Sequence, residues 1–568
     1  MRPFLSASLA AAVLLAGCAT TPRTDSAPAT TLEAGMVSAA DPRAAEAGAG
    51  ILSAGGTATD AALAVLLALN VVEPQSSGIG GGGFAVIDDG KGGLETLDGR
   101  ETAPAAAHPR WFEVDGQALS VPEAIPGGLS VGVPGNVRLM AAAHARHGKL
   151  PWRDLFAPAI RLARDGFAMT PRLRASLDRA RRTGALTPEG RALYYGPDGE
   201  PLPLGTVIHN PAFARFLERL ADEGPDAFYT GANADAIARA VANAPRNPAP
   251  MTAADIAAYR AVSRPPVCTS YRRYRVCGMG PPSSGATTVQ GALGMLERFD
   301  LAALGPDSPV AWHLIAEAQR LAYADRERYL ADSDFVTVPT AGLVSHAYLA
   351  ARARLIAPDR AMASAEPGMP PGAPAAQADT LTPDVPSTSH FVVVDRHGAA
   401  VTLTSTIESA FGSGLVVNGY FLNNELTDFS LAPERDGKPV ANRVEPGKRP
   451  RSSMAPTLVY APDGRLRLAV GAAGGATIPA QVLRAIIGVI DWKLPAQDAL
   501  ALPVLFAPGA VFVEQGSALE AMIPALRALG HAEVAPRAMP LKANAVEVAA
   551  GRPRGAADPR SEGVAVTD

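Results

Sequence analysis

The segment that most constrains this chain begins two-thirds of the way along it, where a proline-, alanine- and glycine-rich run ends at Thr388. From Ser389 onward the residues follow a β-strand pattern, Asp-Arg-His-Gly at 395–398 is a turn signal, and a second strand pattern runs to Thr406. Antiparallel pairing about this turn predicts that Thr388 lies opposite Ser405 or Thr406. The segment therefore predicts a hairpin that begins with a hydroxyl residue and holds a second hydroxyl beside it.

A cut before Thr388 would give this residue both a nucleophilic hydroxyl and a free α-amine. The unperturbed pKa of an α-amine is roughly 7.7–8.0, so the amine can act as a base near neutral pH. A threonine with its own amine as base is one of the few ways to activate a plain hydroxyl. The alternative is an ordinary surface hairpin, in which the threonines serve only as strand formers.

Composition indicates a globular protein with a large core. Of 568 residues, 48% are hydrophobic and 19% are charged. This length is compatible with two to four average domains or with one large layered enzyme. The net charge is −4 and no run of lysine or arginine stands out, which argues against nucleic acid and anionic membrane surfaces as partners.

The N-terminus reads as a targeting segment. Residues 1–17 contain an arginine and then an apolar run that is too short to span a bilayer, as in a signal peptide. The run ends in Leu-Ala-Gly before Cys18, which resembles a bacterial lipobox with Cys18 as the lipidated mature N-terminus. Residues 18–34 then form a flexible tether. We expect a periplasmic protein, lipid-anchored to a bacterial membrane (the outer membrane in preference), and the alternative is a simple secretory signal with an incidental cysteine.

The two other cysteines, Cys268 and Cys277, flank a short β-type run. A hairpin there would bring them within disulfide reach in an oxidising periplasm, and two free buried thiols are the alternative. No histidines stand at metal-ligand spacing from them, so we expect no metal site.

A glycine run at 78–83 precedes a strand pattern that starts at Phe84. The run lacks the Lys-Ser/Thr of a phosphate-binding loop and does not open a helix, which argues against a nucleotide site. Close approach of backbone segments is the better explanation for so many glycines.

Four further segments combine charged, hydroxyl and glycine residues in a way that suits one polar pocket. Arg100 follows a strand pattern, Glu425 and Asp428 are carboxylates three residues apart, and the pair Ser452-Ser453 precedes a strand. The glycine-rich stretch at 471–475 follows a strand, where backbone N–H groups can face a developing oxyanion. Each segment alone is also compatible with an ordinary surface arginine, acidic turn, cap or flexible loop.

Together these segments identify a family. From about Asp41 to the C-terminus, the sequence resembles the γ-glutamyltransferases, which are N-terminal-nucleophile hydrolases. The motifs that carry the resemblance occur in the family's order: Val72-Glu73-Pro74, Ser76 to Phe84, Gly99 to Pro104, Pro282 to Gly285, Thr388-Ser389-His390, Phe411 to Gly414, Leu422-Asn423-Asn424, Asp428-Phe429, Gly447 to Pro450, Ser452-Ser453-Met454, Gly474-Gly475 and Ala557 to Arg560.

The resemblance implies an α+β fold, a four-layer αββα sandwich, made as an inactive precursor. Cleavage between Ser387 and Thr388 would give a large subunit, 35–387, with a Pro/Ala-rich mobile tail at about 363–387, and a small catalytic subunit, 388–568. The two subunits form an intimate heterodimer. Thr388 then attacks the γ-carbonyl of glutathione or another γ-glutamyl compound and passes the acyl group to water or to an amino acid or peptide acceptor. No cofactor is implied.

The resemblance also assigns roles to individual residues. Thr406 supports the Thr388 hydroxyl, and Gly474 and Gly475 supply oxyanion N–H donors. The substrate's α-carboxylate and α-ammonium are expected at six residues: Arg100, Ser452 and Ser453 for the carboxylate, Glu425 and Asp428 for the ammonium, and Glu408 beside it. Binding both charged ends places the γ-carbonyl at the nucleophile.

Two departures from the family pattern bear on specificity. The family usually has asparagine where this chain has Glu408, and a third acid there either strengthens ammonium binding or repels the α-carboxylate. The stretch 430–447 is short and lacks the aromatic gate residue of many members, which predicts a more open acyl pocket. His390 follows the nucleophile, but we interpret it as a strand residue, because the family uses the Thr388 amine as base.

Two other functions remain as alternatives. One is a cephalosporin/glutaryl-amide acylase of the same family, which Asp428 argues against because a glutaryl group has no ammonium to pair. The other is an uncleaved, inactive surface lipoprotein, which the intact Thr388, Thr406 and glycine pair argue against.

Overall fold

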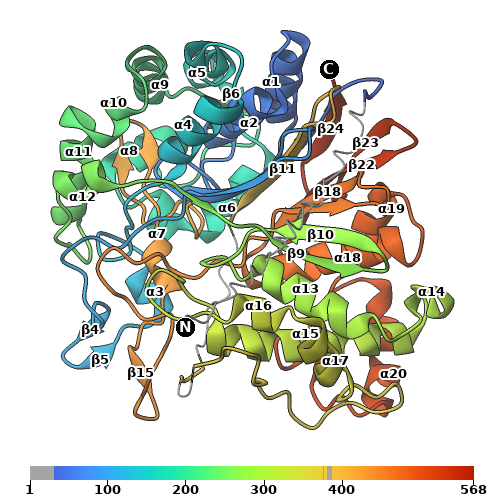
Figure 1. Ribbon diagram of the computed structural model, residues 1–568. Helices are drawn as coiled ribbons and strands as arrows, with labels where there is room; N and C mark the ends of the chain where they lie inside the picture. The colour runs from blue at the N-terminus through green and yellow to red at the C-terminus, as the bar shows by residue number, and fades with distance from the viewer. Residues whose placement is uncertain (1–30, 375–376, 380–386) are drawn as a thin grey trace, which may run out of the picture.

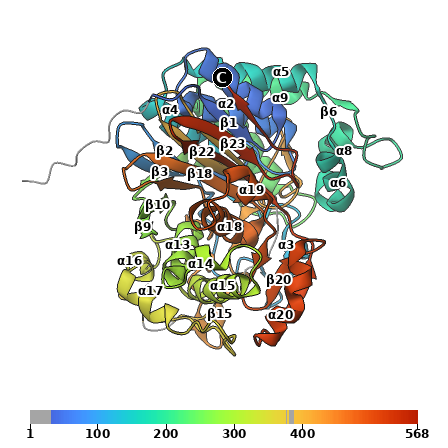
Figure 2. The same cartoon turned by 90° about the vertical axis from the view of Figure 1, so that its right-hand side faces the viewer.

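The computed structural model describes residues 31–374, 377–379 and 387–568. Two antiparallel sheets stack face to face, and helices cover the outer face of each, so the molecule has the four-layer αββα order that the sequence predicts (Figures 1 and 2). The predicted signal peptide and most of the tether, with Cys18, lie outside the described residues.

The first sheet has seven strands in the order β24-β1-β11-β12-β2-β3-β8. Their bounds are β1 (Met36–Ala39), β2 (Gly82–Asp88), β3 (Leu94–Asp98), β8 (Val262–Arg264), β11 (Ser389–Val394), β12 (Ala400–Thr406) and β24 (Val564–Thr567). The second sheet has six strands in the order β23-β22-β18-β17-β10-β9. Their bounds are β9 (Val267–Tyr271), β10 (Tyr274–Gly278), β17 (Thr457–Tyr460), β18 (Leu466–Ala473), β22 (Lys542–Ala549) and β23 (Arg552–Ala557).

Each sheet carries its own helical layer. The first sheet is covered by α1 (Pro42–Ser53), α2 (Ala58–Val72) and α4 (Asn136–His147), with α5 (Ala157–Asp165), α9 (Pro211–Glu223) and α11 (Gly231–Ala242) outside them. The second sheet is covered by α13 (Gly285–Leu296), α15 (Pro309–Tyr329), α17 (His346–Ala353), α18 (Ile478–Ile490) and α19 (Ala496–Ala501). Figure 2 shows these two groups of helices above and below the paired sheets.

The central strands are apolar on both faces because both faces are covered. In β11, Phe391 and Val393 pack in the core beneath α2, whereas Val392 and Val394 pack in the core between the sheets. This alternation follows from the two-residue period of a strand. His390 belongs to the inter-sheet face, where a side chain at Gly471 of β18 would collide with its ring. Burial lowers the pKa of His390 to about 3, so the ring is neutral, as suits a strand residue inside the core.

The predicted hairpin is confirmed. Ser389 pairs with Ser405 across β11 and β12, and this register places Thr388 beside Thr406, as the strand pattern predicts. The glycine run also serves the predicted purpose. A Cβ at Gly80 would lie 2.2 Å from the carbonyl oxygen of Phe421, and one at Gly81 would lie 2.1 Å from that of Thr406. Side chains there would separate the backbone segments that enclose the site.

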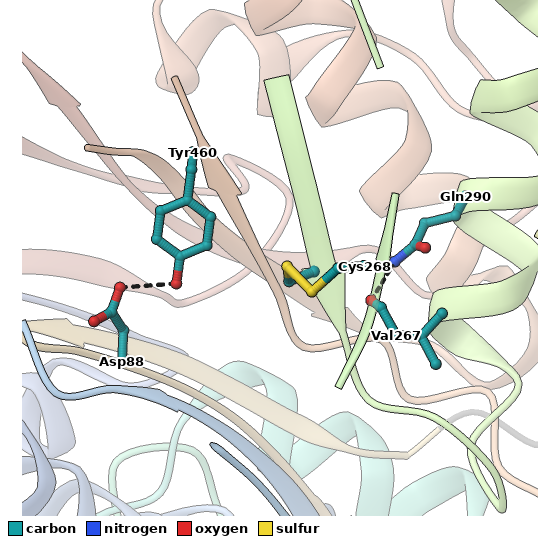
Figure 3. The surroundings of a disulfide bond; sticks show 6 residues. Asp88, Val267, Cys268, Gln290 and Tyr460 are labelled. Atoms are coloured by element: carbon teal, nitrogen blue, oxygen red, sulfur yellow. Dashed lines mark hydrogen bonds between the residues drawn. A yellow bond between two sulfur atoms is a disulfide. The ribbon is translucent and has the colours of Figure 1, made fainter. Parts of the chain in front are cut away.

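Cys268 and Cys277 lie opposite each other on β9 and β10 and form a disulfide (Figure 3). The hairpin that they close is the edge of the second sheet, and Gln290 of α13 donates to the carbonyl oxygen of Val267 beside it. This disulfide is the pairing that the spacing of the two cysteines suggested.

Two expectations about local structure need correction. Residues 310–357 have a helical sequence pattern, but α15 ends at Tyr329 and α16 (Thr340–Leu343) begins only after a non-helical segment whose last residue is Pro339. The predicted mobile tail at about 363–387 is held by hydrogen bonds near its beginning. Arg352 donates to the carbonyl oxygen of Glu366 at 2.7 Å, and Gly368 donates to Asp325 at 2.7 Å.

Candidate active site

Thr388 lies immediately before β11, at the point where the chain enters the central sheet. Its Oγ1 lies 2.7 Å from the carbonyl oxygen of Ser387 and 3.3 Å from Oγ1 of Thr406. Oγ1 of Thr406 donates to the same Ser387 carbonyl oxygen at 2.7 Å. The carbonyl oxygen of the intact peptide bond before Thr388 is therefore hydrogen-bonded by two hydroxyls, the candidate nucleophile and Thr406, and these hydrogen bonds polarise the carbonyl.

The hydroxyl of Thr406 is oriented by the backbone of Glu408. The Glu408 N–H donates to Oγ1 of Thr406 at 2.8 Å, so the hydroxyl proton is directed toward Ser387. Glu408 adopts a φ of 74°, a left-handed conformation that is rare for a residue with a side chain. Such backbone strain is typical of positions where geometry serves a site.

Nine of the residues singled out from the sequence line one polar pocket. They are Thr388, Thr406, Gly475, Arg100, Glu408, Glu425, Asp428, Ser452 and Ser453. Gly474 lines a second and larger hollow, which also includes Thr388 and which we call the outer groove. Thr388 lines both hollows, so a substrate bound across it can extend in two directions.

Arg100 does not stand free to receive a carboxylate, because it is fully buried and paired with both Glu425 and Asp428. It also donates to the carbonyl oxygens of Pro450 at 3.1 Å and Arg451 at 2.9 Å. The predicted carboxylate and ammonium positions are therefore joined by an internal ion pair in the ligand-free chain. A ligand with both charges can take over each half of this pair without leaving a buried charge unpaired.

The acids of the pocket do not all carry charge. Burial raises the pKa of Glu425 to about 8, and it raises the pKa of Glu408 well above the usual range, reinforced by the nearby Asp428 and Glu425. Asp428 keeps 20% of its side chain exposed, against 1% for Glu425. Asp428 is thus the acid that is accessible to an ammonium, whereas Glu425 supports Arg100 from behind.

Glu408 accepts two hydrogen bonds inside the pocket, where burial raises its pKa. Its Oε2 accepts from Ser409 Oγ and from the Asn424 side-chain amide. A protonated carboxyl has nearly the shape of a side-chain amide and, like it, both donates and accepts hydrogen bonds. Repulsion of a substrate α-carboxylate, one of the two effects considered from the sequence, is therefore weak while Glu408 keeps its proton.

The two serines differ in their surroundings. Oγ of Ser453 accepts from Arg326 Nη2 at 2.6 Å, whereas Oγ of Ser452 accepts from the N–H of Met454 at 3.1 Å.

Arg326 and Arg451 also line the pocket, and sequence reasoning assigned neither of them a role. Arg326 sits within α15 among several other arginines, so its sequence context carries no distinguishing signal. Arg451 lies inside the motif that contains the two serines and could have been included on that ground.

Gly474 and Gly475 form a turn between β18 and α18. Their φ values are 139° and 60°, which only glycine adopts readily. The turn leads through a short 3-10 turn, η3 (Gly475–Thr477), into α18, whose N-terminal end favours negative charge. This placement beside Thr388 suits the predicted role as oxyanion donors. None of residues 430–447 lines the polar pocket or the outer groove, and the more open acyl pocket stays a prediction.

A hydroxyl residue immediately before a central strand, inside an αββα sandwich, is the architecture of an N-terminal-nucleophile hydrolase. Comparison with known proteins gives the family. The gamma-glutamyltranspeptidase family model matches residues 44–567, so the chain belongs to this family.

Relatives and solved structures agree with this family assignment. The chain is 36% identical over 541 residues to the glutathione hydrolase proenzyme of Escherichia coli (strain K12), with 93% of this chain and 90% of that protein covered. The fold matches a cephalosporin acylase from Bacillus halodurans with a TM-score of 0.83, 28% identity, and coverage of 97% and 99%. It matches Helicobacter pylori gamma-glutamyltranspeptidase with a TM-score of 0.56, 35% identity, and coverage of 58% of this chain and 94% of that one.

Proposed function

We propose that this protein is a γ-glutamyl acyltransferase and glutathione hydrolase that activates itself by cleavage before Thr388. The observation that carries the proposal is the polar pocket, in which the Arg100–Asp428 ion pair offers one partner for a carboxylate and one for an ammonium beside the nucleophile. A γ-glutamyl group carries both charges at one end and the reacting carbonyl at the other. Binding the charged end therefore presents the γ-carbonyl to Thr388.

Self-cleavage uses the geometry of the intact chain. Oγ1 of Thr388 attacks the Ser387 carbonyl carbon while Thr406 stabilises the oxyanion. The C–N bond breaks, the Thr388 nitrogen leaves with a proton as a free amine, and Ser387 remains attached as an ester. Water hydrolyses this ester, releasing the Ser387 carboxylate and restoring the Thr388 hydroxyl. The large subunit then ends at Ser387 and the small subunit begins at Thr388.

In turnover the new amine takes the proton of the Thr388 hydroxyl as the oxygen attacks the γ-carbonyl. The amide nitrogen of the substrate accepts that proton and leaves, and the γ-glutamyl group stays on Thr388 as an ester. Gly474 and Gly475 stabilise the oxyanion of this step from the N-terminal side of α18. Water or the amine of an acceptor peptide then releases the acyl group.

The similarity to a cephalosporin acylase keeps a glutaryl-amide substrate as the second candidate. Asp428 argues for the γ-glutamyl substrate, because its partly exposed carboxylate would face a glutaryl group with nothing to pair.

Two measurements test the proposal. On a denaturing gel the purified wild type should give two bands, one for a fragment that ends at Ser387 and one for a fragment that begins at Thr388. Thr388→Ala should give a single band. An active wild type that stays a single chain would exclude the mechanism. Hydrolysis of γ-glutamyl-4-nitroanilide should then exceed that of glutaryl-4-nitroanilide. Asp428→Asn should narrow this preference, whereas the reverse preference in the wild type would favour the acylase.

We also propose that Cys18 is lipidated and anchors the protein to the periplasmic side of a bacterial membrane. The lipobox-like sequence supports this proposal. In the described part of the chain, no helix is long and apolar enough to cross a membrane. Mass spectrometry of the mature N-terminus tests the proposal, with Cys18→Ala as the comparison. An unmodified N-terminus beyond residue 18 would contradict it.

A further inference from the structure

The outer groove is the larger of the two hollows described above at Thr388, with a volume of about 1030 Å³. Its lining includes residues of α6 (Pro171–Arg179) and α7 (Arg181–Gly184) and residues 538–541 and 559–562. Ligand sites are typically about 300–1,000 Å³, so this groove has room for several peptide residues. The two residues that follow the γ-glutamyl group in glutathione would fill only part of this volume.

The wall formed by α6 and α7 carries an excess of positive charge. Arg172, Arg179 and Arg182 all line the groove, and in the described structure none of the three lies within ion-pair distance of a carboxylate. Arg560 lines the groove too, but its charge is balanced by Asp558 and Glu514. An excess of positive charge along this wall is unusual in a protein whose net charge is −4.

One acid offsets part of this charge. Glu562 lines the groove, and its Oε1 accepts from the backbone N–H of Arg172 at 2.8 Å. Three arginines without an ion-pair partner and one glutamate therefore line the groove. Glu123, which does not line the groove, is near enough to Arg182 to interact with its charge. Arginine is well suited to hold carboxylates, because its planar fork matches their geometry.

The position of Thr388 decides which part of a substrate reaches this wall. Thr388 lines both the polar pocket and the outer groove. When the γ-glutamyl group occupies the polar pocket, the other side of the scissile amide must extend into the outer groove. The same groove must receive the acceptor that takes the acyl group from Thr388.

We infer that the outer groove selects acidic peptides, both as the leaving portion of the donor and as the acceptor, through Arg172, Arg179 and Arg182. This inference rests on the proposed γ-glutamyl transfer and adds the chemical class of the second substrate. A neutral leaving group is bound only by the apolar parts of the groove, such as Ile125, Met539 and Leu541.

Two donors that differ by one carboxylate on the leaving group test the inference. They are γ-glutamyl-4-nitroanilide and γ-glutamyl-3-carboxy-4-nitroanilide. We expect wild type to have the higher kcat/KM for the carboxylated donor at low salt, with the preference shrinking as salt is added. The triple variant Arg172→Gln/Arg179→Gln/Arg182→Gln should lower the ratio of the two kcat/KM values by about tenfold, through KM.

Arg181→Gln is the matched control. Arg181 is in α7 between the groove arginines, but it pairs with Glu200 at 2.5 Å and does not line the groove. This variant should keep the wild-type ratio. Two bands on a denaturing gel establish that each variant has folded and cleaved itself.

The outcomes separate the inference from the proposed function. If wild type hydrolyses both donors equally, or if the triple variant keeps the wild-type ratio, the inference is overturned and the γ-glutamyl activity stands. If wild type hydrolyses neither donor, the proposed function itself fails. Acceptor peptides extend the test: Ala-Glu-Glu should be γ-glutamylated faster than Ala-Ala-Ala amide by wild type, and the difference should shrink in the triple variant.

Discussion

The ammonium of Lys542 lies 2.9 Å from a carboxylate oxygen of Glu73, and both side chains are buried directly behind the scissile peptide bond. Glu73 also accepts from the hydroxyl of Ser389, the residue after the nucleophile. The pair therefore connects α2 and β22 to the start of β11. Burial lowers the pKa of Lys542 to about 8, although Glu73 opposes the shift.

Removing either partner of this pair leaves a buried charge without compensation. We expect Glu73→Gln and Lys542→Met each to lower the free energy of unfolding by about 3–5 kcal/mol. The double variant should lose clearly less than the sum of the two. Urea denaturation in a Thr388→Ala background keeps every variant a single chain, and additive losses would show that the two side chains are not coupled.

Thr406 should control the rate of self-cleavage. Thr406→Val keeps the shape but removes the hydroxyl that donates to the Ser387 carbonyl, so cleavage should slow by about 10²–10³-fold. Thr406→Ser keeps the hydroxyl and should cleave at close to the wild-type rate. Appearance of the two bands over time after synthesis measures both rates, and equal rates for the valine and serine variants would contradict the oxyanion role.

The raised pKa of Glu408 should appear as a dependence of stability on pH. Below about pH 4.5 the carboxyl is protonated in both the folded and the unfolded chain. Above that pH the unfolded chain releases the proton while the folded chain retains it, because burial raises the folded-state pKa. The contribution of Glu408 to the free energy of unfolding therefore falls as pH rises, by at most about 1.4 kcal/mol for each pH unit, until the folded-state pKa is reached.

Glu408→Gln removes this titration, so its stability relative to wild type should increase with pH above about 4.5. Thermal unfolding at a series of pH values provides the measurement. Glu434→Gln, at an exposed position in β15 (Glu434–Arg435), is the control and should show a constant difference from wild type. A constant difference for Glu408→Gln as well would mean that Glu408 is charged in the folded protein.

The disulfide should contribute stability without affecting turnover. Cys268 and Cys277 are separated by nine positions in the sequence, a short loop, so replacing both by alanine should cost about 2–3 kcal/mol. No residue of the β9–β10 hairpin lines the polar pocket or the outer groove, so kcat and KM should stay at wild-type values. Urea denaturation with and without a reducing agent tests this prediction. Reduction should lower the free energy of unfolding of the wild type and leave that of the variant unchanged.

Local features of this site were predictable from the sequence because each depends on neighbours along the chain. The register of Thr388 and Thr406 follows from strand length and the turn at 395–398, and the glycine run marks close backbone approach before any partner is known. The fold class and the choice of site residues came from the resemblance, which orders separated motifs into one pocket.

Relationships between distant segments were not predictable in the same way. The pairing of Arg100 with Glu425 depends on how two segments 325 positions apart pack. The contact of Arg326 with Ser453 likewise joins segments 127 positions apart. The protonation of Glu408 depends on burial, which a single sequence does not specify. Position-by-position chemistry therefore selected acids that line the polar pocket but could not give the direction of their pKa shifts.

The strand order of the first sheet has a consequence for the cleaved protein. β1 of the proposed large subunit lies between β24 and β11 of the small subunit, and β12 is hydrogen-bonded to β2. Breaking the bond before Thr388 changes the number of chains but leaves every strand with its neighbours. Either half made alone would expose the edges of strands that normally lie in the middle of a sheet, and such edges promote aggregation. We therefore expect folding to precede the proposed cut, and we expect the two subunits to stay joined through the shared sheet afterwards.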